Sequence, residues 1–190
     1  MTKRRWIHLL VCILCTGFGL GMGALSKYCD VAANPFLYLI GEVTSGISIW
    51  AMVCVCITLA AGRPVWAGAY VFFFLGGMLV AYYLVSAYYV GYTYLPAIRF
   101  WSVAAVASFG LGWLEWYIRT PGRLGSVLRC MTVLGVPLLI IADTVMIFDF
   151  GAIVASVALY AAFVWFLKRR LKLRLLPRVK NMDKKNHPQR

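Results

Sequence analysis

The sequence predicts an all-α membrane protein: a bundle of six transmembrane helices (residues 1–167) with both termini in the cytoplasm, and a basic cytoplasmic tail (residues 168–190). Three observations predict this fold class. Of the 190 residues, 63% are hydrophobic and only 13% are charged, about half the charged share of a soluble domain. Six apolar runs approach the length of about 20 residues that a helix needs to cross a bilayer. Ten of the 19 Lys and Arg residues follow Leu167, so the net charge of +13 marks a basic end and not a surface that binds nucleic acid.

The first predicted span, Trp6–Leu25, follows the basic start TKRR and ends in the small residues GMGALS. This order of segments resembles a secretory signal peptide. The apolar run is longer than a typical signal core, so we expect a helix that is retained. The third to sixth predicted spans are Val65–Tyr89, Ala97–Ile118, Arg129–Phe148 and Gly151–Leu167.

The second predicted span, Ser45–Ala61, is short for a membrane crossing. Upstream of it, Asn34 and Pro35 have the pattern of a helix N-cap followed by proline at the first helical position. We therefore expect a helix that begins there and runs on past Glu42. The alternative is that Gly41 and Gly46 break this helix into two pieces.

The orientation follows from Lys and Arg in the short loops, which favour the cytoplasmic side. One side of the predicted bundle carries Lys3, Arg4, Arg5, Arg63, Arg119, Arg123 and Arg129. The other side carries Lys27 and Arg99, which Asp30, Glu42 and Asp149 offset. We expect both termini in the cytoplasm and the protein in the plasma membrane, with the lipid bilayer as its main partner.

Five of the six cysteines lie inside apolar runs, where thiols pack as small hydrophobic groups. The segments CILC and CVC space cysteines as a metal site would, but no histidine accompanies them and their flanks are lipid-like. We expect no metal and no cofactor. The cysteines are Cys12, Cys15, Cys29, Cys54, Cys56 and Cys130.

Charged side chains inside a span are costly and often functional, so the position of each one matters. Glu115 and Arg119, four residues apart on one helical face, are predicted to form an ion pair near the cytoplasmic surface. Asp143 lies about 21 Å along its helix from Arg129 at a rise of 1.5 Å per residue. This distance places Asp143 in the outer half of the bilayer.

Arg99 and Glu42 are expected at the same level as Asp143, which leaves two main interpretations open. In the first, Arg99 pairs with one of the carboxylates and joins helices. In the second, the three residues line an outward-facing pocket. Arg99 would then bind a ligand carboxylate or phosphate, and Asp143 or Glu42 would bind an amine or another hydrogen-bond donor. A proton or ion relay is a third interpretation.

Six tyrosines crowd the stretch AYYLVSAYYVGYTYLP, which begins at Ala81. Most of them are expected at the level of the lipid headgroups, where tyrosines form an aromatic belt. Tyr82 and Tyr89 share a helical face, and we expect this pair on the wall of the pocket. Trp50 and Trp101 are expected to supply stacking surface there.

Four glycines in the segment GFGLGMGA form two pairs, each with a spacing of four residues. Such pairs leave a smooth helical face that another helix can approach closely. The faces pack either within the six-helix bundle or against a partner subunit in the membrane. The glycines are Gly17 with Gly21, and Gly19 with Gly23.

No enzyme signature is present in the sequence, so we expect no catalytic activity. The metalloprotease motif HExxH, the nucleophile elbow GxSxG and the phosphate-binding loop GxxxxGK[ST] are all missing. Active transport would therefore need a partner ATPase or an ion gradient. The basic tail is expected to lie on anionic lipid, where each Lys or Arg contributes about 1 kcal/mol.

The segment ITLAAGRPVWAGAYVFFFLGGMLVAYYL resembles the second–third helix hairpin of the substrate-binding subunits of energy-coupling-factor vitamin transporters. The glycine pairs of the first span are similar to the small-residue stripe with which those subunits meet their membrane partner, although that stripe is usually rich in alanine. The segment AYYLVSAYYVGYTYLPAIRFWSVAAVASFGLGWLEWYIR is similar to small bacterial membrane proteins of unknown function.

The first resemblance implies a small-molecule binding or transport subunit without an ATPase of its own, whose substrate enters from the extracellular side. The alternative hypothesis is a non-catalytic membrane scaffold. Such a protein would act through helix–helix contacts at its glycine faces and through its basic tail.

Overall fold

The computed structural model describes residues 3–91, 94–147 and 150–186, and the side chains of residues 6–91, 94–143 and 150–171. Within these ranges the chain is helical and holds no strand, which confirms the predicted all-α class. The elements are α1 (Lys3–Asp30), α2 (Pro35–Ser45), α3 (Ile47–Ala60), α4 (Pro64–Val90), α5 (Leu95–Glu115), the 3-10 helix η1 (Trp116–Arg119), α6 (Arg123–Ile147) and α7 (Phe150–Asn186).

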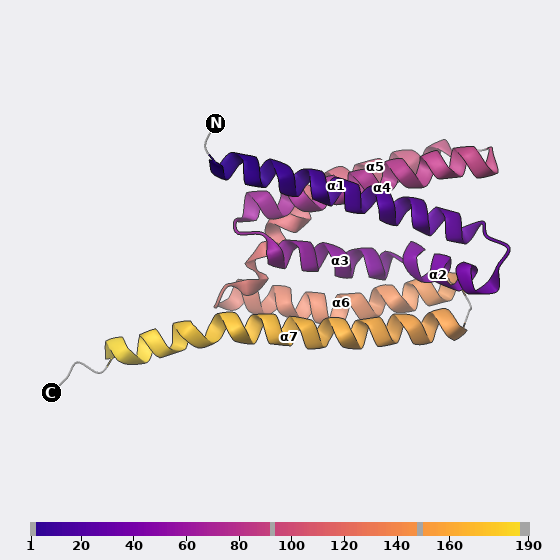
Figure 1. The fold of residues 1–190 in the computed structure, drawn as a ribbon. Helices are drawn as coiled ribbons and strands as arrows, with labels where there is room; N and C mark the ends of the chain where they lie inside the picture. Colours follow the sequence, from indigo (N-terminus) through magenta and orange to yellow (C-terminus); the bar gives the residue numbers. More distant parts are fainter. Residues whose placement is uncertain (1–2, 92–93, 148–149, 187–190) are drawn as a thin grey trace.

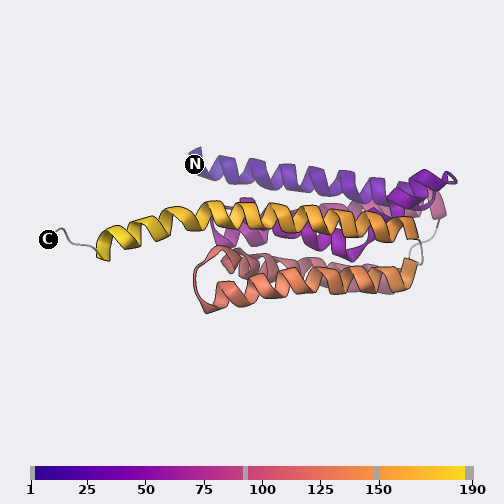
Figure 2. The same cartoon turned by 90° about the horizontal axis from the view of Figure 1, so that it is seen from below.

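The helices form a bundle in which α3 lies between two layers (Figure 1). In one layer α4 packs between α1 and α5, and in the other α6 packs against α7. The view from below shows α1 and α6 on opposite sides of α7 (Figure 2). The main core lies between α3, α6 and α7, around Met52, Val136 and Phe163.

The start of α1 and the end of α7 lie at the same end of the bundle (Figure 1). We call this the basic end, because the turns that carry Arg63, Arg119 and Arg123 are also there. The opposite end, with the last turns of α4 and the first of α5, is the tyrosine end. The helix α7 continues past Leu167 to Asn186, so the basic segment up to that residue is continuous with the last span. The final four residues lie outside the described part.

Five described helices are long and apolar enough to cross a membrane, and a sixth crossing results if α2 and α3 count as one bent span. Of the predicted spans, that of Val65–Tyr89 matches α4 within one residue at either end. The predicted end of the fifth span, Phe148, lies outside the described residues. The length and composition of these helices are those of a multi-pass membrane protein.

The helix pair α2 and α3 is broken where the sequence allows it. Asn34 caps α2 by accepting a hydrogen bond from the backbone N–H of Phe36 (2.9 Å), with Pro35 at the first helical position, as predicted. The chain then bends by 58° between α2 and α3. The break falls at Gly46, whereas Gly41 continues the helix and packs closely on the backbone of Asp30.

The two glycine pairs of α1 have different surroundings. Gly19 and Gly23 are buried, and a Cβ atom on either would collide with a backbone carbonyl of α4, that of Phe74 or Met78. Gly17 and Gly21 are exposed, and a Cβ there would meet no atom within 4 Å. One glycine face therefore joins α1 to α4 inside the bundle, and the other looks outward.

A proline inside α6 connects this helix to α7. Pro137 has no N–H, so the carbonyl of Val133, four residues earlier, loses its helical partner. The hydroxyl of Tyr160 on α7 donates a hydrogen bond to that carbonyl (2.7 Å). In hydrocarbon an unpaired carbonyl costs several kcal/mol. The hydrogen bond from Tyr160 offsets the cost of the proline, because it gives the Val133 carbonyl a partner.

At the basic end, Arg119 donates hydrogen bonds to the carbonyl groups at the end of α3. Arg119, which the sequence predicted to pair with Glu115, donates to the carbonyl oxygens of Ala61 (2.9 Å) and Thr58 (2.6 Å). The indole of Trp116 also donates to Ala61 (3.2 Å). The last carbonyls of a helix attract cations, so these contacts tie η1 to the end of α3.

The unequal glycine faces predict unequal responses to alanine. Gly19→Ala and Gly23→Ala should each lower the free energy of unfolding by ~1–3 kcal/mol, because the methyl group overpacks a backbone contact. Gly17→Ala and Gly21→Ala should raise it by up to ~1 kcal/mol, because alanine favours the helix. Thermal unfolding of the four purified variants in one detergent measures this, and equal shifts for both pairs would contradict the packing.

The contact between α6 and α7 predicts a coupled pair of substitutions. Tyr160→Phe leaves the Val133 carbonyl without its donor and should cost ~1–3 kcal/mol of stability. In a Pro137→Ala background the residue 137 N–H takes that carbonyl, so Tyr160→Phe should cost much less. A double-mutant cycle by thermal unfolding measures the difference, and additive effects would show that Tyr160 acts independently of the proline.

Candidate functional site

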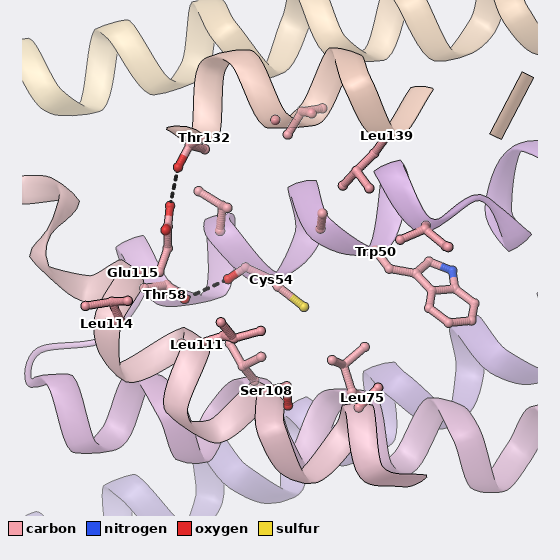
Figure 3. A pocket seen from close by; sticks show the side chains of 18 of the residues that line it. Trp50, Cys54, Thr58, Leu75, Ser108, Leu111, Leu114, Glu115, Thr132 and Leu139 are labelled. Carbon is pink, nitrogen blue, oxygen red and sulfur yellow. Dashed lines mark hydrogen bonds between the residues drawn. The ribbon is translucent and has the colours of Figure 1, made fainter. Parts of the chain in front are cut away.

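A cavity of about 450 Å³ lies between α3, α4, α5 and α6, and we call it the inner cavity. Figure 3 shows its walls, with Cys54 of α3, Leu75 of α4, Leu111 of α5 and Leu139 of α6 around the space. Hydrocarbon side chains form nearly all of the lining. The inner cavity therefore suits an apolar ligand or an apolar part of one.

The inner cavity opens sideways, between α5 and α6. Helix α5 packs on α3, α4 and η1, and α6 packs on α3, α7 and η1. The two helices make little direct contact with each other, and η1 lies between them. Leu111 of α5 and Met131 of α6 line the cavity although each is 65% exposed. In a membrane these side chains face lipid, so the mouth of the cavity is accessible from the bilayer.

One carboxyl group lines the inner cavity, near its basic end. Glu115 accepts a hydrogen bond from the hydroxyl of Thr132 (2.6 Å), and this hydroxyl also lies 2.9 Å from the carbonyl oxygen of Leu128 (Figure 3). The hydroxyls of Thr58 and Ser108 bond to carbonyls of their own helices. These polar groups are thus engaged within the protein, and the rest of the lining stays apolar.

A second cavity, of about 350 Å³, lies toward the tyrosine end, and we call it the outer cavity. Its lining is more polar and includes Lys27, Ser45, Tyr82, Tyr83 and Ser86. The rings of the two tyrosines meet edge to face at a centroid distance of 5.5 Å. The outer cavity therefore combines aromatic walls with hydrogen-bonding groups.

Three side chains lie between the two cavities. Both cavities are lined by Trp50, Leu79 and Trp101, which form the partition. The indole rings of Trp50 and Trp101 meet edge to face at 5.8 Å. The indole N–H of Trp50 donates to the carbonyl oxygen of Thr44 (2.7 Å), which fixes the ring at the bend between α2 and α3.

A chain of hydrogen bonds borders the outer cavity. Ser45 donates to one carboxylate oxygen of Asp30 (2.9 Å), and the buried Ser26 lies 2.7 Å from the Ser45 hydroxyl. Tyr82 approaches the other carboxylate oxygen at 3.5 Å. The amine of Lys27 lies 3.9 Å from this second oxygen and 5.2 Å from the centre of the Tyr82 ring. The chain links α1, α2 and α4 at one level.

Asp143 has a different neighbour from the one predicted. Its two carboxylate oxygens accept hydrogen bonds from the first backbone N–H groups of α3, those of Ile47 (3.2 Å) and Ser48 (2.9 Å). The N-cap residue of α3, Gly46, has no side chain to do this. A carboxylate at a helix N-terminus satisfies unpaired donors and meets the positive end of the helix dipole. Asp143 is therefore a cap supplied by α6.

The other predicted site residues fall into two groups. Tyr82, Trp50 and Trp101 come together around the outer cavity, and their role in binding a ligand stays a prediction. Arg99 is exposed on α5 and Tyr89 is 55% exposed beside the ring of Tyr28 (6.0 Å), and neither lines the two cavities. Glu42 is buried on α2 and lines neither cavity. A ligand-binding role for these three stays a prediction.

Sequence reasoning missed the charged groups that do line the cavities, Lys27 and Glu115. Lys27 entered the sequence analysis only as a loop charge that helps to set the orientation. Its position at the outer end of the first span, at the level of Tyr82 on a neighbouring helix, was the available signal. Glu115 was assigned to an interfacial ion pair, and nothing in the sequence indicated Thr132 as its partner.

Among the described residues, no group of three or more His, Cys, Asp or Glu side chains lies close enough together to hold a metal ion. All six cysteines are unpaired thiols. No protein-family model matches the chain, and neither the characterised proteins nor the solved structures include a significant match. The resemblance to transporter subunits therefore stays a prediction from the sequence.

The capping role of Asp143 predicts a local effect on α3. Asp143→Ala should lower the free energy of unfolding by ~1–2 kcal/mol, as loss of an N-cap does, and should speed hydrogen exchange at the amides of Ile47 and Ser48. Asp143→Asn keeps one acceptor oxygen and should give smaller effects. Hydrogen-exchange mass spectrometry of the detergent-purified variants measures this, and unchanged exchange at the start of α3 would contradict the capping role.

Proposed function

We propose that the protein is a multi-pass membrane protein that binds a small, largely apolar molecule in the inner cavity, as a binding or transport subunit without its own ATPase. The observation that carries this proposal is the cavity of about 450 Å³ among α3–α6 with its apolar lining. Small-molecule sites in proteins have volumes of about 300–1,000 Å³ and are mostly apolar, with few polar groups. The role proposed is one of binding and not of catalysis.

The proposed orientation puts the basic end in the cytoplasm of the cell and the tyrosine end outside. Arg63, Arg119, Arg123 and Arg129 lie in or beside the turns of the basic end, and cytoplasmic loops carry an excess of such residues. Both termini would then be cytoplasmic. In this orientation the outer cavity faces the extracellular side of the plasma membrane, where the substrate would enter.

The lateral mouth between α5 and α6 supports an apolar ligand in a further way. A molecule dissolved in the bilayer reaches this mouth by diffusion in the plane of the membrane, without crossing water. Apolar surface that is already in lipid gains little hydrophobic free energy from entering a cavity, because lipid chains are as apolar as the lining. Affinity would therefore come from packing and from the polar groups at the two ends of the site.

The alternative function, a membrane scaffold, is favoured by one observation. The face of Gly17 and Gly21 on α1 looks outward and accepts close approach, and small-residue faces of this kind mediate helix association in membranes. The scaffold hypothesis predicts a larger membrane complex that purifies with the full chain and is lost when the chain ends at Leu167.

A glycine in the inner cavity tests the proposed binding function. A Cβ atom at Gly135 would meet no atom within 4 Å, and the residue lines the cavity, so Gly135→Leu should fold and fill the space. A ligand at 100 times its dissociation constant stabilises a protein by about 2.7 kcal/mol. We expect hydrophobic probes such as dodecanol to raise the unfolding temperature of the unaltered protein in nanodiscs and to have little effect on Gly135→Leu.

Gly110→Leu is the matched control for this experiment. Gly110 is an equally unobstructed glycine on α5 that does not line the cavity, so this variant should respond to the probe as the unaltered protein does. If dodecanol and a wider panel of vitamins, nucleosides, amines and amino acids left the unfolding temperature of the unaltered protein unchanged, the binding function would be wrong.

A further inference from the structure

The outer cavity has one charged group in its lining, and that group is a cation. Lys27 is the only Lys, Arg, Asp or Glu among the described residues that line it. The side chain of Lys27 is only 17% exposed, and its amine forms an ion pair with Asp30 at 3.9 Å. An anion in the cavity would meet this amine in a partly dehydrated environment, where charge-assisted hydrogen bonds are strong.

The amine of Lys27 has unused hydrogen-bonding capacity. Its closest acidic atom, an oxygen of Asp30, is 3.9 Å away, beyond the range of about 2.7–3.2 Å for a hydrogen bond between nitrogen and oxygen. No described residue accepts a hydrogen bond from it. Asp30 already accepts from Ser45 and Tyr82, and it does not itself line the cavity. Asp30 therefore positions the amine without occupying its three donors.

Further donors lie around the same space. Tyr83, Ser86 and Tyr94 line the outer cavity, and within the described residues their hydroxyls have no hydrogen-bond partner. Three hydroxyls and an ammonium suit the several acceptor oxygens of a carboxylate or a phosphate. A cationic ligand would be repelled by Lys27, which already lies over the face of Tyr82 and so takes the place that an organic cation would occupy.

The outer and inner cavities adjoin one another. Trp50, Leu79 and Trp101 contribute to both linings, so only these three side chains stand between the two cavities, and a molecule that occupied both would have to displace them. The outer part is polar and cationic, and the inner part is a hydrocarbon-lined space that opens to lipid. The two parts together are complementary to a molecule with an anionic head and an apolar tail.

We propose that the two cavities form one binding site for an anionic amphiphile. Its carboxylate or phosphate head binds Lys27 in the outer cavity, and its hydrocarbon tail lies in the inner cavity beyond Trp50 and Trp101. This assignment rests on the proposed binding function and names the class of ligand. It makes Lys27 the residue that distinguishes an anionic head from a neutral or cationic one.

A series of probes with one chain length and different heads tests the assignment. Laurate, dodecyl phosphate, dodecanol, dodecylamine and inorganic phosphate are added to the full chain in zwitterionic nanodiscs, and dissociation constants are obtained from the shift in unfolding temperature. We expect laurate and dodecyl phosphate to bind at least about tenfold more tightly than dodecanol, and dodecylamine more weakly. Tight binding of inorganic phosphate alone would point to a free anion as the ligand and would overturn the amphiphile.

Variants of Lys27 then assign the head-group preference to this residue. Lys27→Gln should weaken binding of laurate about tenfold and leave that of dodecanol unchanged, and Lys27→Arg should keep the preference. Arg63→Gln removes an exposed positive charge at the basic end, away from both cavities, and should change neither probe. If Lys27→Gln does not fold, the double variant Tyr83→Phe and Tyr94→Phe should show the same selective loss to a smaller degree.

The outcomes separate the two proposals. Equal affinity for laurate and dodecanol, with both lost in Gly135→Leu, would leave the binding function standing and overturn the anionic head. A laurate preference that survives Lys27→Gln would likewise overturn the role of Lys27. If none of the dodecyl probes binds the unaltered protein, both the binding function and the ligand class are wrong.

Discussion

The whole bundle depends on one constraint: inside a bilayer every backbone N–H and C=O group needs a partner within the protein. Three irregular stretches among the described helices accordingly receive a hydrogen-bond partner from the side chain of another helix. Asp143 of α6 accepts hydrogen bonds from the first amides of α3. Tyr160 of α7 donates to the carbonyl of Val133, which Pro137 leaves without a helical partner. Arg119 donates to the last carbonyls of α3. These three side chains mark places where the backbone departs from a continuous helix or a helix ends.

The same contacts explain where the cavities lie. Helix α3 is held at one end by Asp143 and at the other by Arg119, and it separates the layer of α1, α4 and α5 from that of α6 and α7 (Figure 1). Because α5 and α6 are joined chiefly through η1, the space between them is left for a ligand or for lipid. The bend between α2 and α3 brings Trp50 against Trp101, which divides this space into an apolar part and a polar part.

Hydropathy was sufficient to predict the apolar helices, and a local pattern was sufficient to predict the cap at Asn34. The sequence left two candidates for a break, Gly41 and Gly46, and the packing of the helices decides for Gly46. The interruption at Pro137 inside α6 was not predicted. Depth along a helix was also used to place Arg99 and Asp143 at one level. Depth alone does not fix the direction in which a side chain points. Arg99 is exposed on α5, and the neighbour of Asp143 is the start of α3, which hydropathy does not reveal. The two glycine faces of α1 were equivalent in the sequence, and only the packing of α4 distinguishes them.

The cap on α3 has a consequence for how the chain enters the membrane. Ile47 and Asp143 are separated by 96 positions in the sequence, so the ribosome has made the third, fourth and most of the fifth crossing before the cap exists. Until then the first amides of α3 are unpaired and are best accommodated by water or by the wall of the insertion machinery. The start of α3 therefore acquires its cap only after α6 has been made, although α3 itself is synthesised early.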